Sequence, residues 1–402
     1  MVIVNLVGVG SFSRLFFVGL GALLISTVTA SVAGIYLGSA SSILELLPGL
    51  MVLLPPLLNM RGCISGVLAS RLSSSMHLGE FEVSFARDSL LGENIRASLV
   101  STIVVAAVLG VFADIMSRLV GIGSLDFIDF MNISVVSGVL SGLVVMAITL
   151  IVAVLSYRYR IDLDMVGAPT VTTSGDLVTL PILIGSALII TALDPLLKNV
   201  LFGAIILLLV GLAIYLWKVT DQVRTISRET IPLLIPLAFM GIVAGTMYTT
   251  DLDRFVTFAA LLILITPFVG GCGSIGGILC SRLATGMHMG SIATDVVPKK
   301  DVMPYFFTSY GYAAVLFPLL GLMAHSAALL LGLSSPGLLE IVCISAGSGF
   351  ILISMVNIIA YATAAMSFRY GLDPDNFGIP VITSTIDFLG AVILISVVSL
   401  VL

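Results

Sequence analysis

The chain alternates long apolar runs with short polar connections from one end to the other. Stretches such as 199–217 and 261–268 are apolar on every side, and the runs have about the 20 residues that an α-helix needs to cross a hydrocarbon core. A transmembrane barrel would instead show short segments of alternating polarity. The pattern predicts an all-α polytopic membrane protein with about 11 transmembrane helices, at 15–37, 44–71, 95–119, 132–156, 170–192, 198–217, 231–250, 255–282, 305–331, 338–366 and 380–401.

Composition agrees with a chain that sits in a lipid bilayer. Hydrophobic residues make up 59% of the 402 residues and charged residues only 10%, whereas a soluble domain carries about 25% charged residues. No basic stripe indicates a nucleic-acid partner. The longest polar connection, about 73–94, is too short for a soluble domain, and no phosphate-binding loop motif is present. We therefore expect no cofactor and no nucleotide-driven step.

The sequence repeats itself at a fixed distance. Residues 56–79 match 267–290 without a gap, and every matched pair lies 211 positions apart. The same offset aligns 32–34 with 243–245, which is difficult to obtain by chance. The predicted organisation is a first five-helix repeat at 1–197, a linker transmembrane helix at 198–218 and a second five-helix repeat at 219–402. Because a five-helix unit ends on the opposite side of the membrane, the linker returns the chain so that the repeats are parallel.

Each repeat places an aspartate inside its last transmembrane helix. Asp176 follows Pro169 by seven residues, and Asp387 follows Pro380 by seven. Proline suits a first helical turn, so each acid should lie about 10 Å into the helix. A carboxylate at that depth is expensive and by default functional, and two of them would supply the charge for a divalent metal ion. Snorkelling to the interface or bonding to arginine is the alternative.

Hydroxyl side chains accompany these acids. Thr172 and Thr383 lie four residues before them, on the same helical face, and are candidates to orient the carboxylates or the waters of the ion.

The second helix of each repeat combines proline with glycine. The segments 55–62 and 266–273 predict a break in each helix, because proline frees a backbone carbonyl. Carbonyl oxygens around Asn59 and Gly270 are then candidate Mg²⁺ ligands. A kinked helix that only packs closely is the other interpretation. Arg61 lies within this span and should pair with a carboxylate such as Asp114 or with carbonyls.

An acidic pair stands at the inner mouth of each repeat. The four residues could concentrate cations, although a solvated loop that caps the next helix explains them equally. They are Asp162 and Asp164 in the first repeat, and Asp373 and Asp375 in the second.

Several motifs resemble those of a known transporter family. Residues 59–62 (Asn-Met-Arg-Gly), followed by 68–73, are similar to the Lys-Gly-Asn and Ala-Ser-Arg-Leu-Ser signature of MgtE-type magnesium transporters, above all the tandem form of solute carrier family 41. Residues 373–376, with Pro380, Thr383 and Asp387, resemble the family's final-helix motif.

This resemblance carries expectations about the site and the assembly. It implies that Asp176 and Asp387 stand at the pore aspartate, and that two halves of one chain replace a homodimer of five-helix subunits. One chain should then form the pore, whether or not it also forms homo-oligomers. Cys63 and Ser274 stand where the family has asparagine, so ion identity is less firmly implied than fold.

Transport of a divalent cation, with Mg²⁺ as the transported ion, fits these observations best. A carrier for an organic solute would favour aromatic and arginine side chains around the site, and the motif segments are small and acidic instead. An intramembrane aspartyl protease also uses two acids, but the accompanying Gly-x-Gly-Asp signature is missing. We expect a transporter that is not an enzyme.

Basic residues predict the orientation of the chain in the cell membrane. With the N-terminus in the cytoplasm, thirteen of the 17 basic residues fall on inner segments and three on outer ones, as the positive-inside bias requires. An odd number of crossings then puts the C-terminus outside. Labelling of cysteines introduced at the two ends, in intact cells, should reach the C-terminal site only; labelling of both or neither would contradict eleven crossings.

Overall fold

All regular elements of the described chain are helices. The computed structural model describes residues 9–123, 125–159, 163–219, 222–294, 298–371 and 378–402. Within these ranges eleven helices are long and apolar enough to cross a membrane, which confirms the predicted fold class. The N-terminal half holds α1 (Val9–Ser39), α2 (Ser41–Leu46), α3 (Gly49–Leu78), α4 (Leu90–Val120), α5 (Phe127–Tyr159) and α6 (Leu163–Thr191). After α7 (Pro195–Lys218) come α8 (Gln222–Thr250), α9 (Leu252–Thr257), α10 (Ala259–His288), α11 (Met303–Leu330), α12 (Leu338–Tyr370) and α13 (Ile379–Val401).

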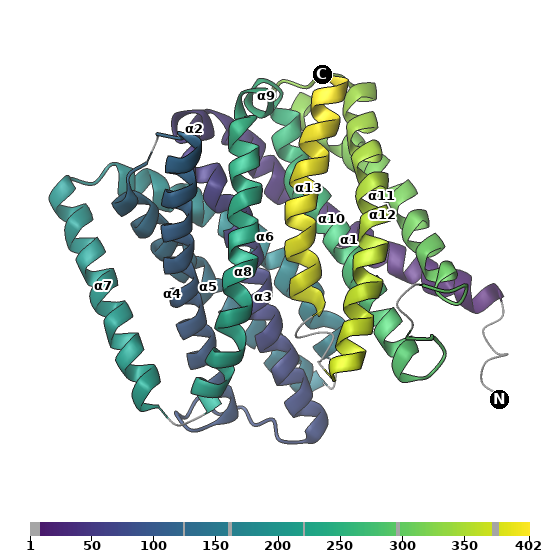
Figure 1. Ribbon diagram of the computed structural model, residues 1–402, viewed down its shortest axis with the longest axis horizontal. Helices are drawn as coiled ribbons and strands as arrows, with labels where there is room; N and C mark the ends of the chain where they lie inside the picture. Colours follow the sequence, from purple (N-terminus) through teal and green to yellow (C-terminus); the bar gives the residue numbers. More distant parts are fainter. Residues whose placement is uncertain (1–8, 124, 160–162, 220–221, 295–297, 372–377) are drawn as a thin grey trace.

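The first helix of each half packs mainly on the other half. Helix α1 lies against α10 and α11, and its counterpart α8 lies against α3 and α4. The remaining helices keep matching neighbours within their own halves, since α6 packs on α3 and α5 as α13 packs on α10 and α12. The two halves are therefore interlocked rather than placed side by side (Figure 1). The exact division at 197 and 218 stays a prediction.

A glycine on each exchanged helix meets carbonyls that proline has freed. Pro267 leaves the carbonyl of Ile263 without its helical donor, since that bond joins residues four apart. A Cβ added to Gly34 of α1 would stand 2.1 Å from this Ile263 oxygen. In the other half, a Cβ on Gly245 of α8 would stand 2.5 Å from the oxygen of Val52, the carbonyl freed by Pro56. Only glycine permits this approach, which allows weak Cα–H···O contacts and close backbone packing.

The predicted breaks in the second helix of each repeat are wrong. Helix α3 runs without interruption through Pro55 and Pro56, and α10 runs through Pro267. The freed carbonyls stay inside the bundle because the glycines of the crossing helices cover them. These freed carbonyls thus serve helix packing, and the candidate ligands at Asn59 and Gly270 stay predictions.

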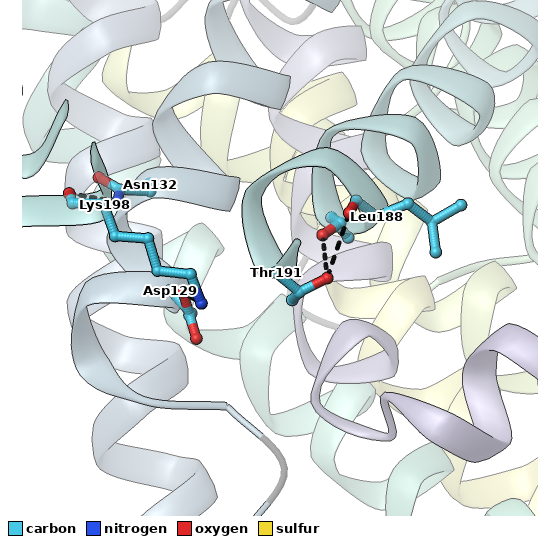
Figure 2. A network of polar contacts seen from close by, with 6 residues as sticks. Asp129, Asn132, Leu188, Thr191 and Lys198 are labelled. Carbon is cyan, nitrogen blue, oxygen red and sulfur yellow. Dashed lines mark hydrogen bonds and ion pairs between the residues drawn. The ribbon is translucent and has the colours of Figure 1, made fainter. Parts of the chain in front are cut away.

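The linker helix α7 is joined to the bundle at its first turn. Lys198 Nζ lies 2.9 Å from Asp129 Oδ1 of α5, and Asn132 Nδ2 donates to the Lys198 carbonyl oxygen at 3.0 Å (Figure 2). Beyond this anchor α7 follows the edge of the bundle near α5 and α4 (Figure 1), and Ile205 is its buried residue. Such an all-round apolar helix suits contact with lipid.

The glycine contacts should determine the stability of the interlocked halves. We expect Gly34→Ala and Gly245→Ala each to lower the melting temperature in detergent, because forcing a methyl group into packed backbone costs about 1–3 kcal/mol. Gly211→Ala on α7 is the matched control, since a Cβ there meets nothing within 4 Å, and alanine favours helix. Equal melting temperatures for all three variants would contradict the proposed role of the crossing.

Candidate cation site

A cavity of about 580 Å³ lies between the two halves. It is lined by α1, α3 and α6 from the first half and by α8, α10 and α13 from the second, so each half contributes the same three helices. Among the described lining residues the acids are Asp176 and Asp387, and the base is Arg282. Two carboxylates from equivalent helices thus face one shared space.

Asp176 of α6 and Asp387 of α13 are both partly buried in the cavity wall. The two residues come from different halves of the chain and line the same cavity. A Cβ added to Gly270 of α10 would stand 4.0 Å from Asp176 Oδ2. The absence of a side chain at Gly270 therefore leaves room beside this carboxylate.

The helices that carry the two acids begin differently. Helix α13 begins at Ile379 with Pro380 in its first turn, as the sequence predicts. Helix α6 begins at Leu163, so the predicted start at Pro169 is wrong and the proline lies inside the helix. Both acids still lie within candidate spans, Ser174–Thr191 and Pro380–Val401.

The remaining acids at the predicted inner mouth are largely outside what the structure describes. Asp162, Asp373 and Asp375 lie outside the described residues. Asp164 and Thr172 lie in α6, where the structure describes their backbone but not their side chains. Their proposed roles stay predictions.

Asn59 ties α3 to α13 close to Asp387. Its Nδ2 donates to Ser384 Oγ at 2.6 Å, and its Oδ1 accepts from Thr383 Oγ1 at 3.3 Å. Cys63 Sγ donates to the same Oδ1, also at 3.3 Å. All these residues except Ser384 line the cavity. The contacts join the first half to the second half through side chains.

The equivalent place on α10 has a glycine instead of asparagine. Gly270 is the counterpart of Asn59 at the 211-residue offset, and its carbonyl accepts from Ser274 Oγ at 2.8 Å within α10. An amide therefore bridges the halves beside Asp387, and no such side chain stands at Gly270.

Arg61 is buried and binds a backbone carbonyl. It is 1% exposed, and its Nη2 donates to the Gly138 carbonyl oxygen at 2.5 Å. Pairing with a carbonyl is thereby confirmed. The suggested pairing with Asp114 is wrong, because Asp114 Oδ1 accepts from Arg118 Nε at 2.9 Å, one turn further along α4. Asp114 therefore pairs with an arginine on its own helix and not with Arg61 on α3.

Two residues with hydroxyl groups line the cavity but were not predicted from the sequence motifs. Tyr248 of α8 and Thr266 of α10 line the cavity and are 1% and 5% exposed. Neither hydroxyl has a hydrogen-bond partner in the described structure. Their counterparts at the 211-residue offset are Leu37 and Pro55, so a search for polar residues that break the repeat would have found them.

The site combines two carboxylates with neutral oxygen groups. Hard divalent cations prefer such oxygen ligands, and Mg²⁺ is commonly held by one or two carboxylates while it keeps several waters. Within the described residues no three histidine, cysteine or acidic side chains cluster as a metal cage. The thiol of Cys63 in the cavity wall is a soft ligand. Such a ligand favours softer metal ions than Mg²⁺.

The sequence matches a transporter family twice. The family described as MgtE, divalent cation transporter, matches residues 54–186 and 265–397, with the same offset of 211 positions. Solute carrier family 41 member 3 of Mus musculus is 25% identical over 86% of this chain and 74% of its own length. Solute carrier family 41 member 2 of Homo sapiens is 28% identical over 85% of this chain.

These relatives extend beyond the matched region. The chain covers 62% of the human member 2 protein. No solved structure matches the chain. Because the two matched segments together span more than half of the chain and include Asp176 and Asp387, the chain belongs to the MgtE family of divalent cation transporters.

Proposed function

We propose that this protein moves Mg²⁺ across the membrane through the cavity between its two halves. The observation that carries the proposal is the meeting of Asp176 and Asp387 at one cavity, from equivalent positions of α6 and α13. A charged side chain at membrane depth is costly unless it faces a partner or an aqueous path. A passing divalent cation supplies the positive charge that neutralises the two negatively charged carboxylates.

The surrounding groups favour a cation that keeps part of its hydration shell. A 580 Å³ cavity has room for an ion with waters, since one water occupies about 30 Å³ in the liquid. Asn59 and Thr383 offer neutral oxygens next to Asp387. Cys63 adds a sulfur at the same place, and its replacement by asparagine should weaken inhibition by soft ions such as Cd²⁺ without abolishing Mg²⁺ flux.

The assembly and location follow from the same geometry. Both aspartates belong to one polypeptide, so a single chain contains a complete site, and oligomers are compatible with transport without being required. We place the protein in the cell membrane with the N-terminus in the cytoplasm and the C-terminus outside. Neither a cofactor nor a catalytic step is needed for this function.

Removing the charge of either aspartate should impair transport. We expect Asp176→Asn and Asp387→Asn each to lower Mg²⁺ flux into liposomes roughly ten-fold or more, because losing one partner of a buried charged contact costs ~2 kcal/mol or more. The double variant should be inactive. Asparagine preserves size, so expression and melting temperature should stay near those of the parent.

Asp114→Asn is the matched control for this experiment. Asp114 also lies within a transmembrane helix, but it pairs with Arg118 and is not among the cavity-lining residues. We expect parental flux from this variant. If both cavity variants transport Mg²⁺ like the parent, the aspartates are structural and the proposal fails.

A further inference from the structure

One positive charge of the cavity wall, that of Arg282, is not neutralised by an acid of the described chain. Arg282 lies on α10 and lines the cavity, and among the described residues no carboxylate forms an ion pair with it. The residue is partly exposed, and none of its nitrogens belongs to the buried polar atoms without partners. The guanidinium group is therefore a charge that the contents of the cavity can reach.

The equivalent arginine of the first half has a different environment. Arg71 lies 211 positions before Arg282, and its Nη2 lies 2.8 Å from Glu229 Oε2 near the start of α8. Neither Arg71 nor Glu229 is among the cavity-lining residues. The position equivalent to Glu229 is Val18, which carries no charge. The two repeats thus keep the arginine but differ in the acid that would neutralise it.

Arg282 stands apart from the two aspartates along the bundle. Asp176 lies beside a position of α10 that precedes Arg282 by twelve residues, which corresponds to about 18 Å of helix. The start of α13 lies close to the level of Arg282, because a Cβ on Gly378 would stand 3.1 Å from Cys280 Sγ. Asp387 follows nine residues later, about 13 Å along α13. The guanidinium group therefore stands between the aspartates and the end of the cavity where α10 ends.

Glycines leave the space between these levels open. On α3 a Cβ added to Gly62 or Gly66 would meet nothing within 4 Å, and the same holds for Gly277 on α10. All three line the cavity. In the proposed orientation α10 ends on the cytoplasmic side. A cation that moves between the aspartates and this inner end of the cavity therefore passes the guanidinium group of Arg282.

We propose that Arg282 forms an electrostatic barrier at the inner end of the cation path and so limits the rate of transport. An arginine side chain stays protonated in proteins, so the barrier is permanent. A divalent cation that passes a unit charge at about 6 Å in water is disfavoured roughly ten-fold. The inference rests on the proposed transport function and adds a residue that acts on the ion without binding it.

Removing the charge of Arg282 tests the barrier in the full chain reconstituted in liposomes. Arg282→Gln and Arg282→Met should each raise Mg²⁺ flux per folded chain roughly 2- to 10-fold at low ionic strength, whereas Arg282→Lys keeps the charge and should restore the low parental flux. The gain should shrink as an inert monovalent salt is raised to about 1 M, because the Debye length then falls to about 3 Å. A merely structural residue would show no such dependence on salt.

The double variant Arg71→Gln/Glu229→Gln is the matched control. It removes the equivalent arginine together with its acid, outside the cavity lining and without a change in net charge, so flux should remain parental. Parental or lower flux in both neutral variants of Arg282, or a gain that is equal at low and high salt, overturns the barrier. If Asp387→Asn is impaired while the neutral variants are parental, only this inference fails; a parental Asp387→Asn would overturn the transport site itself.

Discussion

The close approach of a glycine on one helix to a carbonyl freed by proline on another is the contact on which this architecture depends. Gly34 meets the Ile263 carbonyl, and Gly245 meets the Val52 carbonyl. In a bilayer, apolar side chains gain little by leaving lipid, so helices associate through close packing and backbone contacts. These two crossings place α1 on the second half and α8 on the first. The cavity exists because the halves are held together in this exchanged way.

Exchange of the first helices explains why the site is shared and yet unequal. Equivalent helices surround the cavity, so the two aspartates face the same space. Their neighbours have diverged: Asn59 bridges α3 to α13 near Asp387, whereas Gly270 leaves space next to Asp176. Two identical subunits cannot separate such roles, but a duplicated chain can. A tandem repeat thereby permits one ion path with a different chemical character on each side.

Much of this arrangement is accessible from sequence because the membrane limits the possible structures. Apolar length predicts the eleven spans, and the constant offset of 211 positions predicts that Asp176 and Asp387 occupy equivalent places. The continuity of α3 and α10 is not predictable in the same way. Proline marks where a helical bond is lost, but whether the helix breaks depends on what covers the carbonyl, here a glycine from a distant helix. Tyr248 and Thr266 were not predicted because isolated hydroxyls in apolar runs have no periodic signal. Their departure from the 211-residue repeat marks them in the sequence, but the fold is what brings them to the cavity.

The two halves of one polypeptide should enclose a complete ion path. Reconstitution into liposomes at decreasing protein density, with Mg²⁺ influx measured per chain, tests it most directly. We expect flux per chain to stay constant when vesicles contain on average less than one chain. Flux per chain that disappears on dilution would contradict it, since the path would then require residues from a second chain.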